Sequence, residues 1–502
     1  TLRVLREYEA ALKAFEQSLK VQSESTTNTA KIMDIRAWTL NQKGIVHERL
    51  RQFEEAYQAY AEASQRKPEL WHQANLIKML LKGRKYQEAQ QHIDTMMGGG
   101  ANYPDGHILK ARMLLELLQP DKALISAQNA TTFAPRNAEA WIVQGECFLM
   151  LRRPADAAMA FAQASRCAPR NVRVWMYLAS AHLRAKNFVE AHYAAGEAVR
   201  LKPDNYRALA RLGRARLQLE RPAEALDAFE RALSLAPRLI TALEGKAEAL
   251  EALGRPEEAA VVWATLAQTG HEGKNQHLLL AQSLVKADKL PEALEALQQA
   301  LLHRPKDVEV YKLQGLVFMR QGRYDEAANA YQRTVELAPE DVWNHSRLVN
   351  ALIRGGERYA ALDAVDEALE AHPDSASLWV LQGRVLRDLH RPDQALRAYD
   401  RALQLEPESA SAWIGKGLAL VEPGQRQEAL DCFQRASGLN PELSWAWYQQ
   451  GVVLIELGRY GEAIESLNRV LMIDPHNRKA SVKRDEARKK NDAELKAKRD
   501  AP

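Results

Sequence analysis

The sequence predicts an all-α solenoid built from helical hairpins that repeat every 34 residues. Three kinds of residue recur at this interval and in phase with one another, which marks an internal repeat. Prolines occupy the first position: Pro475, Pro441, Pro407, Pro373, Pro339, Pro305, Pro237, Pro203, Pro169 and Pro135. Small residues occupy the second: Gly451, Gly417, Gly383, Gly315, Gly213 and Gly145, with Ala281, Ala247, Ala179 and Ala111 elsewhere. Alanine occupies the third, in every copy from Ala89 to Ala463. Amino-acid composition alone would not place three such series in the same register. The chain is therefore an array of many copies of one repeat.

Each unit contains two helices, as residues 446–475 illustrate. Apolar residues recur at helical rather than alternating spacing between Trp447 and Ile455. Gly458 then interrupts the run, as a glycine just beyond a helix end does. A second amphipathic run covers 463–471 and stops before Pro475, which cannot continue a helix. We therefore expect two helices of about 12–14 residues, each roughly 20 Å long. One hairpin cannot bury both of its apolar faces, so each must pack against its neighbours.

The residue order within a unit resembles the tetratricopeptide repeat. A tryptophan precedes the glycine of the first helix, and the second helix opens with Gly-Arg-Tyr-x-Glu-Ala at 458–463. The clearest copies are 377–407 and 310–339, and the resemblance extends over almost the whole chain. It implies a right-handed superhelical solenoid whose first helices line a concave groove, where partner peptides bind. It does not imply one function, because this fold is used by many systems.

The repeat register divides the chain into four parts. We expect a partial repeat at 1–22, a polar insertion and lead-in at 23–36, and thirteen tandem repeats at 37–475. The charged residues 476–502 are expected to form a capping helix and tail, which shields the last hairpin of such arrays. The sequence begins inside a repeat and with threonine, so we expect it to be part of a longer protein.

Composition bears on the binding partners, the redox compartment and the membrane association expected of this protein. The net charge of +4 on 502 residues implies no general affinity for nucleic acid or membranes. The three cysteines are scattered and lack the spacing of metal ligands, which favours a reducing compartment such as the cytoplasm. No apolar run approaches the ~20 residues that span a bilayer. Export remains an alternative, because the natural N-terminus is expected to be missing.

The sequence contains none of the common catalytic motifs. It has no P-loop, dinucleotide-binding fingerprint, HExxH motif or nucleophile elbow. We therefore predict no catalytic, cofactor or metal site in this chain. Any function must then lie on the surface of the solenoid.

When the groove positions of the tetratricopeptide repeat are placed on this sequence by its repeat register, they predict two groups of groove residues. The basic group, in the repeats that start at 172 and 206, contains Arg173, Arg184, Arg207, Arg211 and Arg214. The apolar and aromatic group, in the C-terminal repeats, contains Val380, Ile414, Leu418, Trp445, Tyr448 and Val452. The basic group predicts a partner with an acidic segment or a carboxylate terminus, and the apolar group predicts a docked helix or extended peptide. Alternatively, the arginines are solvated or paired with nearby carboxylates, and Trp445 packs on the preceding hairpin.

Three functions follow from these observations. The favoured one is a non-enzymatic scaffold that binds a segment of a partner protein in the groove. The second is the sensor or regulatory region of a larger multidomain enzyme or signalling protein. RNA binding is the least favoured, because the basic residues are confined to two repeats between acidic ones and the pI of about 8.7 is mild. The sequence does not identify the partner or the oligomeric state.

Overall fold

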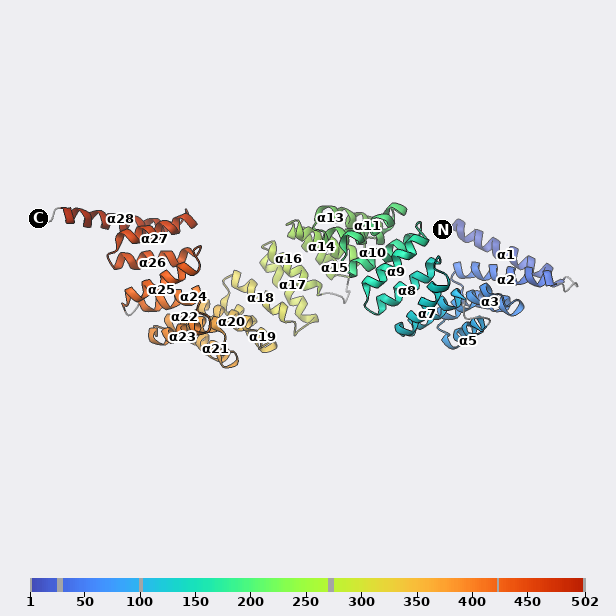
Figure 1. Cartoon of the computed structure of the whole chain (residues 1–502), viewed down its shortest axis with the longest axis horizontal. Coiled ribbons are helices and arrows are strands. Elements are labelled where there is room, and N and C mark those ends of the chain that lie inside the picture. The colour runs from blue at the N-terminus through green and yellow to red at the C-terminus, as the bar shows by residue number, and fades with distance from the viewer. Residues whose placement is uncertain (1, 25–29, 99–102, 270–274, 422–423, 500–502) are drawn as a thin grey trace. The chain divides into compact units, whose positions relative to one another are not determined.

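The computed structural model describes residues 2–24, 30–98, 103–269, 275–421 and 424–499, which form α-helices joined by short turns and contain no strand (Figure 1). The chain divides into two compact units, Thr1–Val262 and Trp263–Pro502. The first unit contains α1 (Leu2–Glu24), α2 (Ala30–Arg49), α3 (Phe53–Arg66), α4 (Leu70–Lys82), α5 (Tyr86–Met97), α6 (Pro104–Glu116), α7 (Pro120–Phe133), α8 (Ala138–Met150), α9 (Pro154–Cys167), α10 (Val172–Arg184), α11 (Phe188–Leu201), α12 (Tyr206–Gln218), α13 (Pro222–Leu235) and α14 (Ile240–Ala252). The unit boundary falls within α15 (Pro256–Ala267).

The second unit continues the same alternation of first and second helices. It contains α16 (Gln276–Lys286), α17 (Leu290–His303), α18 (Val308–Arg320), α19 (Tyr324–Leu337), α20 (Val342–Gly355), α21 (Arg358–Ala371), α22 (Ala376–Asp388), α23 (Pro392–Leu405), α24 (Ala410–Val421), α25 (Arg426–Leu439), α26 (Ser444–Glu456), α27 (Tyr460–Ile473) and α28 (Arg478–Arg499). The predicted all-α solenoid of helical hairpins is confirmed, and α26 and α27 have the expected lengths.

The helices nearest the two ends of the sequence pack on the hairpins next to them. Helix α2 begins at Ala30, so part of the lead-in expected at 23–36 is helical, while residues 25–29 lie outside the described residues. Helix α1 packs on α2. At the other end, α28 packs on α27 through the buried residues Ala480 and Ala487.

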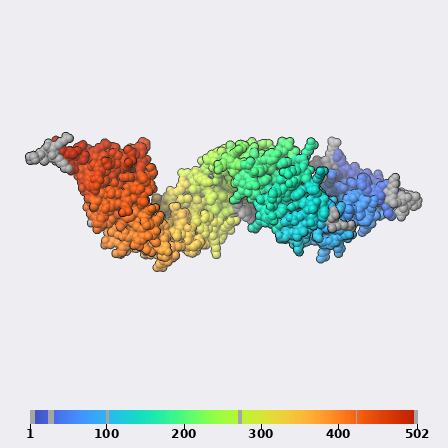
Figure 2. Space-filling model, viewed as in Figure 1, coloured from blue at the N-terminus to red at the C-terminus, as the bar shows by residue number. Residues whose placement is uncertain are grey.

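Within each unit the hairpins pack in two layers. From α2 to α14 in the first unit and from α16 to α28 in the second, each first helix contacts its own second helix, and that second helix contacts the next first helix. First helices also contact one another in series, as α4, α6 and α8 do in the first unit and α20, α22 and α24 in the second. Figure 2 shows the outer surface of these hairpins on one face of the molecule. Series of first helices therefore share one face of the stack in each unit, which we call the first-helix face.

The turn between the two helices has one residue with left-handed backbone in every repeat. Gly458 has φ 75° there, and Gly254, Gly322, Gly356 and Gly424 are equivalent. In other repeats this position holds a residue with a side chain, such as Arg152 or Glu220, at φ 56–57°. Glycine removes the steric cost of this conformation but is not required for it. The helix break expected at Gly458 is thus confirmed.

The recurring small residue has a specific packing partner. A Cβ atom at Gly145 would lie 2.5 Å from the ring of Phe161, which is completely buried between the two helices. Gly383 and Tyr399 have the same relationship at 2.8 Å. A ring from the second helix therefore occupies the space that a side chain on the first helix would need, which explains the periodic glycine.

The recurring proline and tryptophan are joined by a hydrogen bond. The indole Nε1 of Trp379 donates to the carbonyl oxygen of Pro373 at 2.8 Å, and Trp447 donates to Pro441 at 2.9 Å. His345 occupies the same position and contacts the carbonyl oxygen of Pro339 at 2.9 Å through Nε2. This bond satisfies a carbonyl at the junction between repeats, where no helical partner is available.

Candidate protein-interaction site

The open side of the first-helix face is lined by equivalent residues in different repeats. On α12 these are Arg207, Ala210, Arg211 and Arg214, which follow the i, i+3, i+4, i+7 spacing of one helix face. Residues at the same positions of α6 and α18 line two other clefts. The repeat register therefore determines which side chains this face presents.

Three of the five predicted arginines meet in one cleft of about 410 Å³. We call it the arginine cleft, and its lining residues are Leu183, Arg207, Ala210, Arg211, Arg214, Leu239 and Thr241. The guanidinium groups lie beside apolar side chains from the end of α10 and the start of α14. The cleft thus combines positive charge with apolar surface.

Arg211 and Arg207 carry charge that no carboxylate of the described residues neutralises. Arg211 is half-buried, and its Nε donates to Oγ of Ser180 at 2.6 Å. Its Nη1 donates to the backbone oxygen of Arg207 at 3.0 Å. Burial, followed by the nearby charge of Arg207, lowers the pKa of Arg211. Both effects disfavour the charged form, so an incoming anion would be stabilised here.

The remaining predicted arginines are placed differently. Arg214 pairs with Glu248 on α14. Arg173 donates to the hydroxyl of Tyr177 at 3.1 and 3.2 Å and lies 3.8 Å from Glu146. Pairing with carboxylates, the alternative interpretation, therefore applies to these two residues.

Arg184 is exposed at the C-terminal end of α10 and does not line the arginine cleft. Its place in the repeat is four positions beyond that of Arg214, outside the set of positions that line the clefts. The structure therefore brings Arg207, Arg211 and Arg214 together and leaves Arg184 apart.

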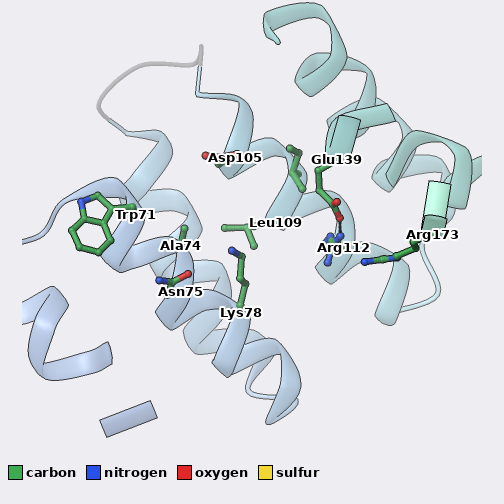
Figure 3. Close-up of a pocket in the computed structure, with 10 residues that line it drawn as sticks. Trp71, Ala74, Asn75, Lys78, Asp105, Leu109, Arg112, Glu139 and Arg173 are labelled. Atoms are coloured by element: carbon green, nitrogen blue, oxygen red, sulfur yellow. Dashed lines mark ion pairs between the residues drawn. The ribbon is translucent and has the colours of Figure 1, made fainter. Parts of the chain in front are cut away.

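A second cleft of the same volume lies nearer the N-terminus and contains Arg173 (Figure 3). Its lining residues are Trp71, Ala74, Asn75, Lys78, Asp105, Ile108, Leu109, Arg112, Glu139 and Arg173. Figure 3 shows Glu139 of α8 paired with Arg112 of α6, and the Arg173 side chain extending toward them. Burial lowers the pKa of Arg112. The sequence analysis missed this cleft because its charges come from four different helices.

The predicted apolar group divides into buried and exposed members. Ile414 is only 9% exposed and belongs to the hydrophobic core, so it is not available as a groove contact. Val380, Leu418, Tyr448 and Val452 are half-buried.

Trp445 is the exposed member of the group, at 47%. Its ring stacks on that of Tyr448 from its own helix, with centroids 5.6 Å apart and planes 16° apart. An aromatic pair with open surface is therefore present on the first-helix face of α26.

The second unit also has a cationic and aromatic cleft that the sequence analysis missed. The Nζ of Lys312 and the guanidinium of Arg347 lie over the ring of Trp343, at 5.1 and 4.8 Å from its centroid. Lys312 pairs with Glu309 and Asp341, both at 3.2 Å. Arg347 is exposed and has no carboxylate partner among the described residues. In the sequence, the four-residue spacing of Trp343 and Arg347 indicates that their side chains are neighbours on one helix face.

No group of three or more histidine, cysteine, aspartate or glutamate side chains in the described ranges could hold a metal ion. Among the helices described, none has the length and apolarity needed to cross a bilayer.

The solved structures that resemble this chain have low sequence identity to it. The APC/C heterotetramer Cut9–Hcn1 matches with 14% identity and a TM-score of 0.39, over 90% of this chain and 96% of that chain. Yeast Tom70 matches with 15% identity and a TM-score of 0.38, over 92% and 97%. Pseudomonas aeruginosa pilF matches with 22% identity and a TM-score of 0.37, over 42% and 96%. No curated protein sequence matches this chain.

Models of the tetratricopeptide repeat match most of the sequence. One model matches 108–171, 151–206, 278–342 and 380–436, and three others match 206–239, 318–385 and 444–477. These segments carry the proline, glycine and alanine series and the two-helix units described above. The chain belongs to the tetratricopeptide-repeat family.

Proposed function

We propose that this chain is a non-enzymatic scaffold that binds an acidic segment of a partner protein on its first-helix face, with the arginine cleft as the anchor. One observation carries the proposal: the guanidinium groups of Arg207 and Arg211 form no ion pair with any carboxylate of the described residues. Other arginines on this face pair with a carboxylate of a neighbouring repeat, as Arg214 does with Glu248 and Arg112 with Glu139. The charges of Arg207 and Arg211 are therefore the ones that remain available to a ligand in this cleft.

The chemistry of the cleft favours a carboxylate ligand. A guanidinium donates two parallel hydrogen bonds to a carboxylate, and such charge-assisted bonds are stronger than neutral ones. Arg211 is already partly desolvated and is held in place by Ser180, so little conformational entropy is lost when it binds. Leu183 and Leu239 supply apolar contacts beside the charge. We therefore expect an aspartate, glutamate or terminal carboxylate next to an apolar side chain.

The second unit offers separate contacts for the partner. Trp445, stacked on Tyr448, presents exposed aromatic surface, and aromatic residues are common anchors in protein interfaces. Val380, Leu418 and Val452 add half-buried apolar surface on the same layer of helices. We propose that these residues bind an apolar part of a partner segment.

The test uses a fluorescein-labelled peptide of twelve residues in which aspartate and glutamate alternate with leucine. Fluorescence anisotropy measures its dissociation constant with the full chain and with the variant Arg207→Glu/Arg211→Glu. We expect the variant to bind at least about tenfold more weakly, because two favourable charge pairs become repulsive. Arg401→Glu is the matched control, since Arg401 is exposed on the second helix α23 and donates a hydrogen bond to the uncharged side chain of Gln404.

Three outcomes would contradict the proposal. One is no binding of the peptide to the full chain. Another is equal affinity of the double variant and the full chain. The third is tighter binding of a single-stranded RNA of equal length, with a steep salt dependence, which would favour nucleic acid as the partner.

A further inference from the structure

Exposed apolar side chains recur on the opposite face of the first unit, on consecutive second helices. Ile125 of α7, Met159 of α9 and Tyr193 of α11 are 62%, 63% and 64% exposed. They are 34 residues apart and therefore occupy the same position of three neighbouring repeats. Val189, 65% exposed, lies one turn before Tyr193. We call these four residues the apolar stripe.

The same position is polar in most other repeats. The equivalent residues are Gln58, Gln91, Asp227, Glu295, Asn329, Asp363, Arg397, Asp431 and Glu465, and the remaining one is Val261. The fold therefore does not need an apolar side chain there. Single exposed apolar residues need no explanation, but a group of them repeated at one position on the same face indicates an interaction surface.

The surface around the stripe has few charges. Helix α7 has no charged residue between Ala123 and Phe133, and α9 has none between Ala157 and Ser165. Exposed Gln128 and Asn129 lie beside Ile125 on α7. Depletion of charge around exposed apolar residues is typical of the core of a protein–protein interface.

The helix face that carries the stripe is large enough for a second copy of the chain. The three helices are each 14 residues long. At ~1.5 Å per residue and ~10 Å between neighbouring helices, they present roughly 600 Å². Two copies together would bury about 1,200 Å², the lower end of the range for specific, stable interfaces.

The charges at the edges of the stripe are also self-complementary. The first turns of α7, α9 and α11 carry Asp121, Asp156 and Glu190, and the last turns of α9 and α11 carry Arg166 and Arg200. If two copies meet with their helices antiparallel, the acidic ends of α9 and α11 face basic ends, whereas α7 has no basic residue in its last turn. With parallel helices, like charges would meet. Asp156 and Arg200 already pair with Arg153 and Glu197, so this effect selects the orientation and adds little affinity.

We propose that the apolar stripe is a homodimer interface in which the two-fold axis runs along the stack of repeats. In this arrangement each helix of the stripe crosses its own copy, and Ile125, Met159 and Tyr193 each face the same residue of the second chain. The interface is isologous, as in most soluble homodimers. It leaves the first-helix face of both copies free for partner segments.

Sedimentation velocity over a concentration series of the full chain tests the association. We expect a monomer–dimer equilibrium, and Met159→Glu should raise the dimer dissociation constant at least about thirtyfold, as loss of an interface hot spot does. Asn329→Glu is the matched control, because it introduces the same side chain at the same repeat position in the second unit. Circular dichroism should show equal helicity in all three proteins. A chain that stays monomeric at 100 µM, or a dimer unaffected by Met159→Glu, would overturn the proposal.

Disulfide cross-linking tests the orientation. The background variant is Cys167→Ser, since Cys167 is half-buried whereas Cys147 and Cys432 are buried. In that background, Ile125→Cys should form a covalent dimer under mild oxidation, because each Ile125 faces its own copy. The parallel arrangement would instead link Ile125→Cys only to Tyr193→Cys in a mixture of the two variants. A cross-link found only in the mixture would contradict the proposed two-fold axis.

Discussion

The Nε atom of Arg211 donates to the hydroxyl oxygen of Ser180, in the preceding repeat, at 2.6 Å. This bond holds a half-buried guanidinium in place without neutralising it, because a hydroxyl has no charge. Where Glu248 accepts from Arg214, by contrast, the charge is paired within the solenoid. The residue opposite each arginine thus decides whether its charge remains available to a ligand.

The first prediction concerns Ser180. Replacing it with aspartate should place a carboxylate next to Arg211 and neutralise the charge that the acidic peptide needs. We expect Ser180→Asp to weaken peptide binding about tenfold, with thermal stability unchanged or higher. Ser180→Ala should retain most of the affinity, because the charge of Arg211 stays uncompensated. Anisotropy and thermal unfolding measure the two effects, with Ser234→Asp, exposed on α13, as the control. Equal binding by Ser180→Asp and Ser180→Ala would contradict this explanation.

The second prediction concerns the periodic glycine. A Cβ at Gly383 would lie 2.8 Å from the ring of Tyr399, which is fully buried. We expect Gly383→Ala to destabilise the second unit by about 1–3 kcal/mol, the usual cost of overpacking. Gly438, near the end of α25, has nothing within 4 Å of such a Cβ. Gly438→Ala should therefore stabilise by up to about 1 kcal/mol. Urea unfolding followed by circular dichroism should show midpoints that move in opposite directions, and a shift of both in one direction would be inconsistent with the ring contact.

The third prediction concerns the junction between repeats. Trp379→Phe removes the indole donor and leaves the carbonyl of Pro373 without its bond. We expect a loss of about 1 kcal/mol, since the remaining packing of the ring is retained. Trp445→Phe is the control, because that exposed indole stacks on Tyr448 and does not face a proline carbonyl. The comparison again uses the urea midpoint, which should fall only for Trp379→Phe.

The fourth prediction concerns pH. Burial raises the pKa of the Cys147 thiol to about 12, that of Cys432 to about 11 and that of the Tyr399 hydroxyl to about 12. In the unfolded chain a thiol ionises near ~8.5 and a phenol near ~10. Because the folded pKa is the higher one, these groups contribute their full stability below the unfolded pKa and lose it as pH rises toward 12. We expect stability to fall steadily above about pH 9, and less steeply in Cys147→Ala.

The same thiols provide a chemical check. At pH 8 iodoacetamide should label Cys167, which is half-buried, before either of the two buried cysteines. Mass spectrometry of the peptides identifies the labelled residue. Rapid labelling of Cys147 in the folded protein would show that its burial is incomplete.

Much of the fold could be predicted because its information is local and repeated. The helix break at Gly458, the helices on either side of it and the small residue at Gly383 each follow from a pattern within a single 34-residue repeat. The start of α2 at Ala30 was not predicted, because the register near the N-terminus lacks the proline that marks a junction.

The site could be predicted only in part, because it depends on pairs of residues from different repeats. Ile414 has the register of a groove residue but packs in the core. Arg184 belongs to the basic repeats but stands outside the positions that line the cleft. Trp343 and Arg347 line a cleft that the distribution of arginines along the sequence did not indicate.

By itself, the sequence determined that this protein is a stack of two-helix repeats. Each hairpin must bury its apolar faces against the next one, and the apolar pattern therefore repeats every 34 residues. Only the tertiary structure decided which charges remain free. Within the described part of the chain, Arg207 and Arg211 have no carboxylate partner, whereas Arg173 and Arg214 do. The partner of each arginine comes from a neighbouring hairpin, whose side chains are positioned only by packing.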